Sequence, residues 1–412
     1  MASIEKRNGR YRITVSNGFD SRGKRIKEVT TFAPVPGLTP KQEEKALQKF
    51  VMEFEDKVKN GTCYAGDKIT LSQFSKKWVQ EYAKLNLREK TYQEYVKLLN
   101  SKILPLMGHL KIGKITPLHI EEFKSRLLSD GIREDGRQGG YSPATATRYY
   151  AVLSKMLSCA AAWNLISYNP CRNVGAPKQS RSNSDIKHFT LEQANCFLES
   201  IEGEDTQHKA IAYLALISGM RVGELTALTW ADINYDNNTI SIDKATSKVK
   251  GGQIITPPKN KTSVRVISAP VEVMALLKQL QYEQKQRRLQ LGSKWVNTNF
   301  VFTQWNGMQI NYYTPSHWFR KHLQRYNAAL MASDLSQEEK DKRLLPIITF
   351  HGLRHTSATL LISQHVDVRT VSNRLGHAQT STTMNIYAHS LKQSDENAAN
   401  LLGDILHVKN AQ

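Results

Sequence analysis

The chain has 412 residues, more than one ordinary hydrophobic core holds, so two or three domains are expected. No apolar run can span a bilayer, the start lacks a signal-peptide core, and the four cysteines lack CxxC spacing, so we expect a cytoplasmic protein with reduced thiols. The net charge of +20 indicates a polyanionic partner, of which nucleic acid is the first candidate, although charge alone also fits a merely basic protein.

Residues 3–32 alternate between apolar and polar side chains, which is typical of strands. Turns of a small antiparallel sheet are predicted at Asn8-Gly9, Asn17-Gly18 and Arg22-Gly23. Residues 40–58 follow an N-cap at Thr39 and carry apolar side chains at helical spacing, so one helix should cover the sheet. The remaining basic side chains form either phosphate contacts or a solvated face, and they include Arg10, Arg12, Arg22, Lys24 and Arg25.

Residues 68–174 are predicted to be helical. Apolar stripes at helical spacing, two of them opened by a first-turn proline, begin near Leu71, Tyr92, Thr116 and Ser142. We expect the aromatic residues of these stripes to form a core rather than platforms for base stacking. Polar residues between the stripes, among them Lys90 and Arg148, are candidates for contacts with a duplex.

Residues 175–187 are polar and contain Gly, Pro and Ser, which predicts an interdomain linker. Residues 188–412 then read as helices, a short strand, a basic hairpin around Lys248–Ile267, and helices to the end. The amphipathic segment 401–408 is expected to pack either on its own domain or on a neighbouring protomer. The whole pattern predicts a mainly α chain with small β-sheets.

Two clusters after residue 188 combine basic side chains with breaks in regular structure. A helix is expected to break at Gly219 and resume, with Arg221 at the interruption and Glu224 one turn later. Arg221 is either a residue of a functional site or only an ion-pair partner of Glu224. In TPPKNKTSVRVISAP, Lys259 and Lys261 precede a strand, and periodicity does not choose between them. Hairpin lysines are usually exposed and inert.

Two further clusters contain histidine. In HGLRH, His351 and Arg354 share a helix face, and His351 and His355 have the spacing of a zinc-binding HExxH helix. Zinc is disfavoured because Gly352 replaces the glutamate and a cationic arginine stands between the histidines. The stretch LGHAQTSTTMNIYAHS, residues 375–390, carries His377 and Tyr387. Read alone, Tyr387 fits a half-buried aromatic residue as well as a nucleophile.

Together these clusters satisfy the chemical needs of phosphoryl transfer from a diester without a metal. Guanidinium groups clamp non-bridging oxygens through paired, charge-assisted hydrogen bonds, and their charge matters most in the transition state. A phenol, with a pKa of about 10, is a poor nucleophile unless a base or a cationic field helps remove its proton. Histidine is suited to be that base, and lysine is suited to protonate the departing alkoxide.

The motifs GMRVGEL, HGLRH, LGH and the tyrosine at 387 resemble the Arg…Lys…His-x-x-Arg…His…Tyr signature of the tyrosine recombinases, the phage-integrase family. Lys261 fits the hairpin lysine of the family better than Lys259, because KTSVRV matches the usual spacing. Glu224 matches an acidic position that orients a neighbour. The resemblance implies that Arg221 and Arg354 hold the scissile phosphate, His377 donates to it, His351 assists proton transfer, and Tyr387 attacks to form a 3′-phosphotyrosine.

The same resemblance implies an architecture and partners. It predicts an arm-type DNA-binding domain (residues 1–64), a helical, SAM-like core-binding domain (68–174) and a catalytic domain (188–412). Such enzymes act as tetramers on two duplexes, pass through a Holliday junction to integrate or excise a mobile element, and need neither metal nor nucleotide. An excision factor and a host DNA-bending protein are candidate partners.

Two other classes of protein remain alternatives at this stage. A type IB topoisomerase would use the same chemistry to relax supercoils as a monomer, and the arm-like domain argues against it. A non-catalytic DNA-binding regulator would explain the charge and the three domains. It would not require Arg221, His351, Arg354, His377 and Tyr387 together.

Overall fold

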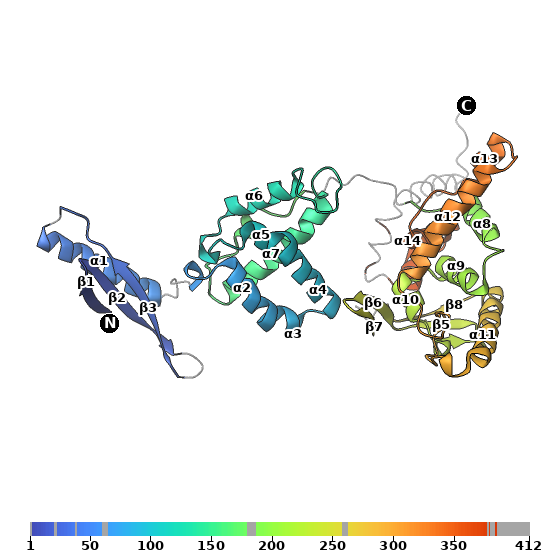
Figure 1. Cartoon of the computed structure of the whole chain (residues 1–412), viewed down its shortest axis with the longest axis horizontal. Helices are drawn as coiled ribbons and strands as arrows, with labels where there is room; N and C mark the ends of the chain where they lie inside the picture. Colours follow the sequence, from blue (N-terminus) through green and yellow to red (C-terminus); the bar gives the residue numbers. More distant parts are fainter. Residues whose placement is uncertain are drawn as a thin grey trace, which may run out of the picture. The chain divides into compact units, whose positions relative to one another are not determined.

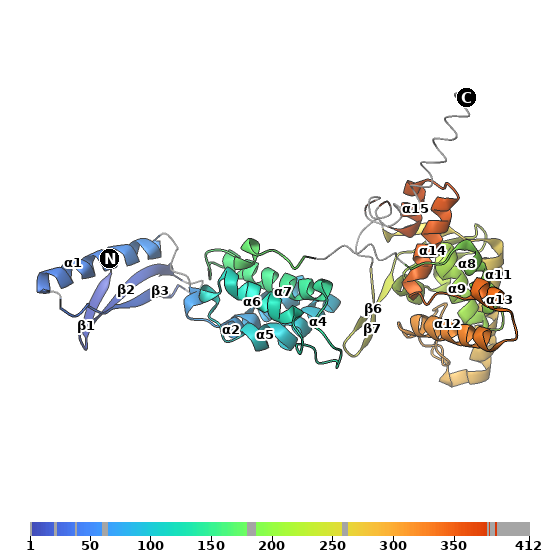
Figure 2. The same ribbon diagram turned by 90° about the horizontal axis from the view of Figure 1, so that it is seen from above.

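The structure is a computed structural model that describes residues 2–19, 23–37, 39–59, 65–178, 187–257 and 263–376, together with Gln379 and Met384. The chain divides into two compact units, Met1–Ser180 and Arg181–Gln412. Figures 1 and 2 show the elements of each unit from two directions. Within the described ranges, no helix is both long enough and apolar enough to cross a membrane. The division between the two units falls within residues 175–187 of the sequence, whereas the finer boundaries of three domains stay a prediction.

The first unit begins with an antiparallel sheet of strands β1 (Ser3–Arg7), β2 (Arg10–Phe19) and β3 (Arg25–Phe32), in that order. Helix α1 (Pro40–Lys59) lies along one face of this sheet (Figure 1). The apolar face of β2 packs against the helix, as predicted, because the pleat sends alternate side chains to opposite faces. The buried residues of this small core are Ile13, Val15, Leu47 and Val58.

The predicted turns of this sheet have different outcomes. Asn8 and Gly9 form the expected two-residue turn, with φ values of 48° and 72°, which suits a tight hairpin. The predicted turn at Asn17-Gly18 is wrong, because both residues lie within β2. The register shifts between Ser16 and Phe19, so one extra residue forms a bulge there, and Gly18 supplies a positive φ. Arg22, of the third predicted turn, lies outside the described residues.

The second part of this unit is helical, as predicted. Its helices are α2 (Leu71–Trp78), α3 (Lys84–Asn86), α4 (Glu89–Leu98), α5 (Leu104–Met107), α6 (Pro117–Leu128) and α7 (Pro143–Ala162). Thr116 and Ser142 cap α6 and α7 with their side chains, which confirms both predicted helix starts. The apolar stripes converge on one core that includes Phe74, Trp78, Phe123 and Leu153, so these aromatic residues serve packing.

The second unit, which contains the four motif clusters, is built mainly from helices. These are α8 (Leu191–Ser200), α9 (Thr206–Ser218), α10 (Val222–Ala227), α11 (Val271–Leu291), α12 (Thr314–Ala332), α13 (Gln337–Arg343), α14 (Phe350–Ser363) and α15 (Val368–Leu375). The strands are β4 (Ile233–Asn234), β5 (Thr239–Ile242), β6 (Ala245–Val249), β7 (Gly252–Thr256) and β8 (Arg265–Ser268). The predicted fold class, mainly α with small β-sheets, is confirmed.

The strand pairing corrects the prediction of one basic hairpin around Lys248–Ile267. Among the described residues, strands β6 and β7 form a two-stranded sheet with each other, whereas β8 joins β5 in a separate sheet of order β4-β5-β8. The pairing is non-local: Ile267 lies opposite Ile240, and both side chains are buried. Burial of Ile267 against the core therefore favours β5 as the partner strand of β8.

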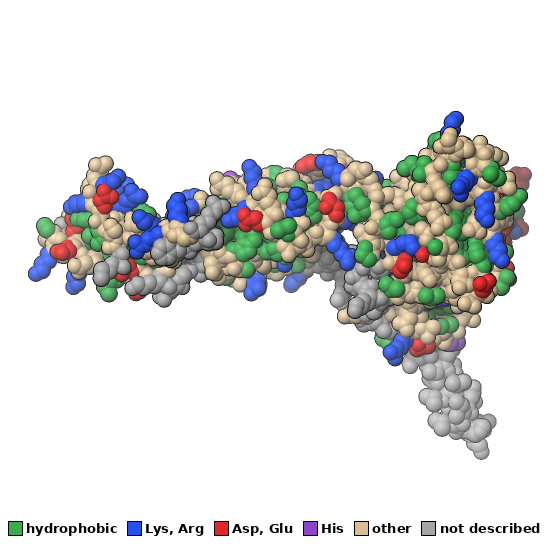
Figure 3. Space-filling model, turned by 90° about the horizontal axis from the view of Figure 1, so that it is seen from below, with side chains coloured by type: hydrophobic (Ala, Val, Ile, Leu, Met, Phe, Trp, Pro, Cys, Tyr) green, Lys and Arg blue, Asp and Glu red, His purple; other side chains and the backbone are tan. Residues whose placement is uncertain are grey.

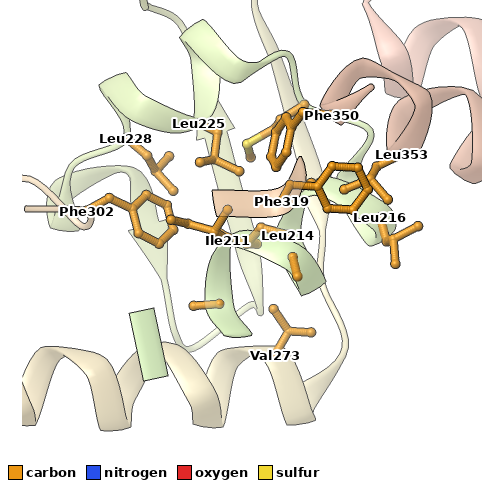
Figure 4. Close-up of a cluster of buried hydrophobic side chains, with 14 of the residues drawn as sticks. Ile211, Leu214, Leu216, Leu225, Leu228, Val273, Phe302, Phe319, Phe350 and Leu353 are labelled. Carbon is orange, nitrogen blue, oxygen red and sulfur yellow. The ribbon is translucent and has the colours of Figure 1, made fainter. Parts of the chain in front are cut away.

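Helix α9 lies at the centre of the core of this unit and is apolar on nearly all sides, as a buried helix must be. Figure 4 shows Ile211 and Leu214 of α9 among side chains from α10, α11, α12 and α14, including Leu225, Phe319 and Leu353. Since α9 ends at Ser218, this packing fixes in space the point from which the chain leads into GMRVGEL.

Candidate active site

The site is built at the break between α9 and α10. Gly219 ends α9 with left-handed backbone angles (φ 60°, ψ 24°), and a Cβ at this position would lie 2.4 Å from Leu375 Cδ2. Both facts demand glycine. Arg221 then adopts an extended conformation immediately before α10, and its side chain is 39% exposed. The predicted helix break is confirmed, and it presents Arg221 at the surface.

Glu224 binds Arg221 and a second arginine at once. Its Oε2 accepts hydrogen bonds from the Arg221 backbone N–H (3.0 Å) and from Arg265 Nη2 (2.9 Å), while Oε1 accepts one from Arg221 Nη1 (2.8 Å). Burial on its own would raise the pKa of Glu224, but the hydrogen bond and charge of Arg265, with the charge of Arg221, hold that pKa below its ordinary value. Pairing with Glu224 occupies Nη1 of Arg221 and leaves Nη2 to a weaker contact, 3.4 Å from Gly376 O.

Helix α14 carries the HGLRH motif to the same place. Thr349 caps the helix by accepting a hydrogen bond from the Gly352 N–H. Arg354, only 2% exposed, donates from Nη1 to the carbonyl oxygen of Gly219 at 2.6 Å. The helix break and the HGLRH helix are thus joined through the side chain of Arg354. Gly352 is required by packing, because a Cβ there would lie 2.9 Å from Lys187 O.

The two histidines of HGLRH lie edge to face, with ring centroids 4.9 Å apart. Partial desolvation of the His351 ring, and then the charges of Arg354 and Arg221, lower the pKa of His351. Burial, His351 and Arg354 lower the pKa of His355 to about 4. Both imidazoles are therefore neutral at neutral pH, the form that accepts a proton. Among the residues that the structure describes, no group of three or more His, Cys, Asp or Glu side chains is arranged to hold a metal.

Two more arginines lie at the site, and the sequence motifs assign a role to neither of them. Arg265 of β8, with a side chain only 6% exposed, contacts Glu224 and donates from Nε to Arg374 O at 2.7 Å. Arg374 of α15 donates from Nη2 to Ile217 O (2.9 Å) and Ser268 O (3.1 Å). Burial and the charge of Arg265 lower the pKa of Arg374. Arg265 was detectable as a polar residue that shares the inward face of its strand with Ile267.

The described part of the site therefore holds four guanidinium groups, two of which pair with the carboxylate of Glu224 while the other two bind backbone carbonyl oxygens. Such an excess of positive charge at a helix break favours an anion, and guanidinium forks match the geometry of phosphate oxygens. The remaining predicted residues, Lys261, the alternative Lys259, His377 and Tyr387, lie outside the described residues. Gly376, which immediately precedes His377, is the last residue of the continuous described range 263–376.

The predicted DNA-binding residues lie in the first unit. Arg10 and Arg12 are exposed, and β2 alternation places them on the face opposite Ile13; Arg25 donates to Ser16 Oγ at 2.8 Å. Lys24 and Lys90 are exposed, and Arg148 forms an ion pair with Glu94, while Arg22 lies outside the described residues. On the face shown in Figure 3, Lys and Arg side chains are spread along the described parts with Asp and Glu among them. Their role in DNA binding stays a prediction.

Comparisons with known proteins place this site in a family. Residues 186–394 match the model of the phage integrase family, and residues 70–128 match the phage integrase N-terminal SAM-like domain. A tyrosine recombinase XerC-like protein of Caldanaerobacter subterraneus is 26% identical over 96% of this chain and 96% of its own length. The ICEBs1 integrase of Bacillus subtilis is 26% identical over 98% of this chain and 100% of its own length.

Solved structures show the same fold. The Tn1549 transposon integrase in complex with transposon right end DNA matches with a TM-score of 0.62 and 22% identity, over 80% of this chain and 100% of that chain. The fold and the matched family define a site-specific DNA-cleaving and rejoining enzyme of the tyrosine recombinase class. The chain belongs to the phage integrase family, whose model covers more than half of its length. The predicted family and enzyme class are confirmed.

Replacing Glu224 with glutamine is expected to destabilise the second unit in a pH-dependent way. Removing one partner of a buried ion pair costs about 3–5 kcal/mol. Because the pKa of Glu224 is lower in the folded state, its contribution is present above the ordinary glutamate pKa and is lost as the pH falls through the folded value. Urea unfolding should therefore show a large difference between wild type and E224Q that persists from neutral pH down to about pH 4 and shrinks only below it.

Glu338→Gln is the matched control, since Glu338 is an exposed residue of α13 that pairs with Lys342 on the surface. Exposed pairs of this kind contribute about 0–1 kcal/mol. Equal unfolding free energies for E224Q and wild type at neutral pH would contradict the assigned role of the buried carboxylate.

Proposed function

We propose that the chain cuts DNA through a covalent 3′-phosphotyrosine at Tyr387, with Arg221 and Arg354 holding the scissile phosphate. The observation that carries the proposal is the meeting of these two arginines at the α9–α10 break, where Arg354 hydrogen-bonds to Gly219 O and Arg221 follows two residues later. One arginine is buried and held by the backbone, while the other is partly exposed, and this combination suits a fixed receptor for a phosphodiester.

The proposed cleavage step balances without a metal or a nucleotide. The Tyr387 oxygen attacks phosphorus, and the bond from phosphorus to the 5′-oxygen breaks. Neutral His351 assists removal of the phenol proton, and Lys261 protonates the departing 5′-oxygen. His377 donates a hydrogen bond to the phosphate. The phosphotyrosine conserves the energy of the diester bond, so attack by a 5′-hydroxyl of another strand rejoins the DNA.

We assign the three predicted domains separate DNA contacts. Residues 1–64 would bind arm-type sites through the exposed sheet face that carries Arg10 and Arg12, while residues 68–174 and 188–412 would hold the core site. Net charge and the solvated arginines of the sheet support this assignment. The enzyme would act as a homotetramer in the bacterial cytoplasm, on nucleoid DNA. An excision factor and a host DNA-bending protein would set the direction of the reaction.

Related proteins support the integration of a mobile element as the biological role. The relatives include the ICEBs1 integrase, which is 26% identical, and the transposase from transposon Tn916 of Enterococcus faecalis, which is 22% identical. A solved lambda integrase is a tetramer bound to a Holliday junction. A phage or a conjugative transposon would serve equally well as the source of the element.

A nicked duplex that carries the attachment site tests the proposal. The site is obtained by sequencing the junctions of the integrated element, and the nick lets a short strand diffuse away and traps the cleaved complex. We expect a covalent protein–DNA adduct with wild-type protein, followed by strand exchange between two intact sites. Relaxation of a plasmid without exchange would instead indicate a topoisomerase, and DNA binding without an adduct would indicate a regulator.

A further inference from the structure

Arg265 lies in an unusual position for a charged residue on a short strand. In β8 its side chain points inward beside that of Ile267, whereas the apolar neighbours Val264 and Val266 are exposed. A strand that exposes valines and buries an arginine loses hydrophobic burial and desolvates a charge. Such an arrangement persists when the buried group makes compensating contacts, and Arg265 makes several.

The guanidinium of Arg265 bridges three segments of the site. Nη2 donates to Glu224 Oε2 at 2.9 Å, Nε donates to Arg374 O at 2.7 Å, and Nη1 donates to Ser263 O at 3.2 Å. The carboxylate of Glu224 also accepts hydrogen bonds from the backbone and the side chain of Arg221, so it links Arg265 to Arg221. Through Arg374, Arg265 reaches the last turn of α15.

Gly376 packs directly on Arg265. Its backbone is left-handed (φ 69°), and a Cβ there would lie 3.0 Å from Arg265 Nη1 and 3.4 Å from Cζ, so a side chain would push the guanidinium away. The carbonyl oxygen of Gly376 also lies 3.4 Å from Arg221 Nη2. The residue that immediately precedes His377 is therefore held between Arg265 and Arg221.

We propose that Arg265 is a positioning residue for DNA cleavage, which sets the orientation of Arg221 through Glu224 and the exit of the chain from α15 toward His377. This inference rests on the proposed function of the site. Arg265 itself is covered by Glu224, Gly376 and the end of α15, so it acts through these groups rather than by touching the scissile phosphate.

The planar fork of arginine is what this role requires. Three nitrogens of one rigid group point to three acceptors, on Glu224, Arg374 and Ser263, and lysine has no fixed geometry that reaches all three. Without the fork, Arg221 would be the one charged partner left to Glu224 among the described residues, and the carboxylate would be free to turn and carry Arg221 with it. The α15 carbonyl would lose its donor at the same time.

Single-turnover cleavage of the nicked duplex by R265M and R265K is the test. Groups that orient the ligands of a catalytic metal commonly contribute about 10- to 100-fold to activity, and we take the same range for a group that orients a phosphate-binding arginine. We expect R265M to slow adduct formation by about that factor and R265K to fall between R265M and wild type. Affinity for the core site, measured with Tyr387→Phe in each background, should stay unchanged. Arg287→Met, at an exposed position of α11, is the matched control.

A second substrate separates positioning from general damage to the fold. In a methylphosphonate, a methyl group replaces one charged oxygen of the scissile phosphate, so the demand for correctly placed arginines falls. If Arg265 acts by positioning Arg221, R265M should slow the phosphate substrate more than the methylphosphonate. Equal slowing of both substrates, or cleavage at the wild-type rate, would overturn the proposal. If R265M does not fold, the cleavage rates of the two substrates are compared in R265K instead, and the same outcomes apply.

A double-mutant cycle with Glu224→Gln tests the route through which Arg265 acts. If Arg265 works largely through Glu224, E224Q combined with R265M should slow cleavage little more than the slower single variant. If the rate losses of the two single variants multiply in the double variant, Arg265 does not act through Glu224. Failure of wild-type protein to form any adduct would refute the proposed function itself, and adducts with wild type but unchanged rates in R265M would refute only the role of Arg265.

Discussion

Replacement of Tyr387 by phenylalanine is expected to abolish the covalent protein–DNA adduct while leaving DNA binding intact. The change removes a single oxygen, which is the atom that attacks phosphorus in the proposed step. Loss of a catalytic nucleophile lowers turnover by about 10⁴-fold or more. Denaturing gels of the nicked-duplex reaction should show the adduct with wild type and none with Y387F, while a filter-binding assay shows equal affinity.

Tyr282→Phe is the matched control, because it removes the same atom from an exposed tyrosine of α11. Y282F should form adduct at the wild-type rate. An adduct that survives in Y387F would mean that another residue is the nucleophile. Digestion of that adduct and sequencing of the linked peptide would then identify the residue.

Arg221→Ala is expected to give the second largest loss, with little damage to the fold. An arginine that stabilises charge in a phosphoryl-transfer transition state contributes about 10³- to 10⁵-fold to the rate. The side chain is 39% exposed, so its removal opens no buried cavity. The remaining buried pair between Glu224 and Arg265 keeps the carboxylate compensated. Single-turnover cleavage should fall by about 10³-fold or more, with a melting temperature close to that of wild type.

Two further variants show whether the expected loss of cleavage is specific to Arg221. Arg287→Ala, on the exposed face of α11, should change neither cleavage nor melting temperature. Arg354→Ala should lower both, because Arg354 is buried and its loss leaves Gly219 O without the donor at 2.6 Å. If R221A cleaved DNA at the wild-type rate, Arg221 would be only a structural partner of Glu224, and the phosphate-binding role would be wrong.

Local patterns were sufficient for much of the fold. The alternation of β2, the turn at Asn8-Gly9 and the capped starts of α6 and α7 follow from interactions within a few residues, and the structure confirms them. The errors came where pairing with another strand overrides the local pattern. Asn17-Gly18 has the composition of a turn, yet pairing with β3 carries the strand through it as a bulge. Strand β8 follows the basic hairpin in sequence but pairs with β5.

For the candidate site, too, some features follow from the sequence and others appear only in the structure. The order and spacing of Arg221, HGLRH, LGH and Tyr387 carried enough chemical information to indicate the family and the enzyme class, because each residue type has a distinct task in phosphoryl transfer. Sequence also left Arg221 with two readings, site residue or partner of Glu224. In the structure the pairing with Glu224 is present and still leaves Arg221 partly exposed at the helix break.

The roles of Arg265 and Arg374 appear only in the folded chain. The sequence motifs assign a chemical task to neither residue, and their partners on Glu224, Ile217 and α15 are remote in sequence. A sequence specifies which side chains can bind a phosphate, because that depends on chemical type. Which buried groups hold those side chains in place depends on packing between distant elements, and local patterns do not contain that information.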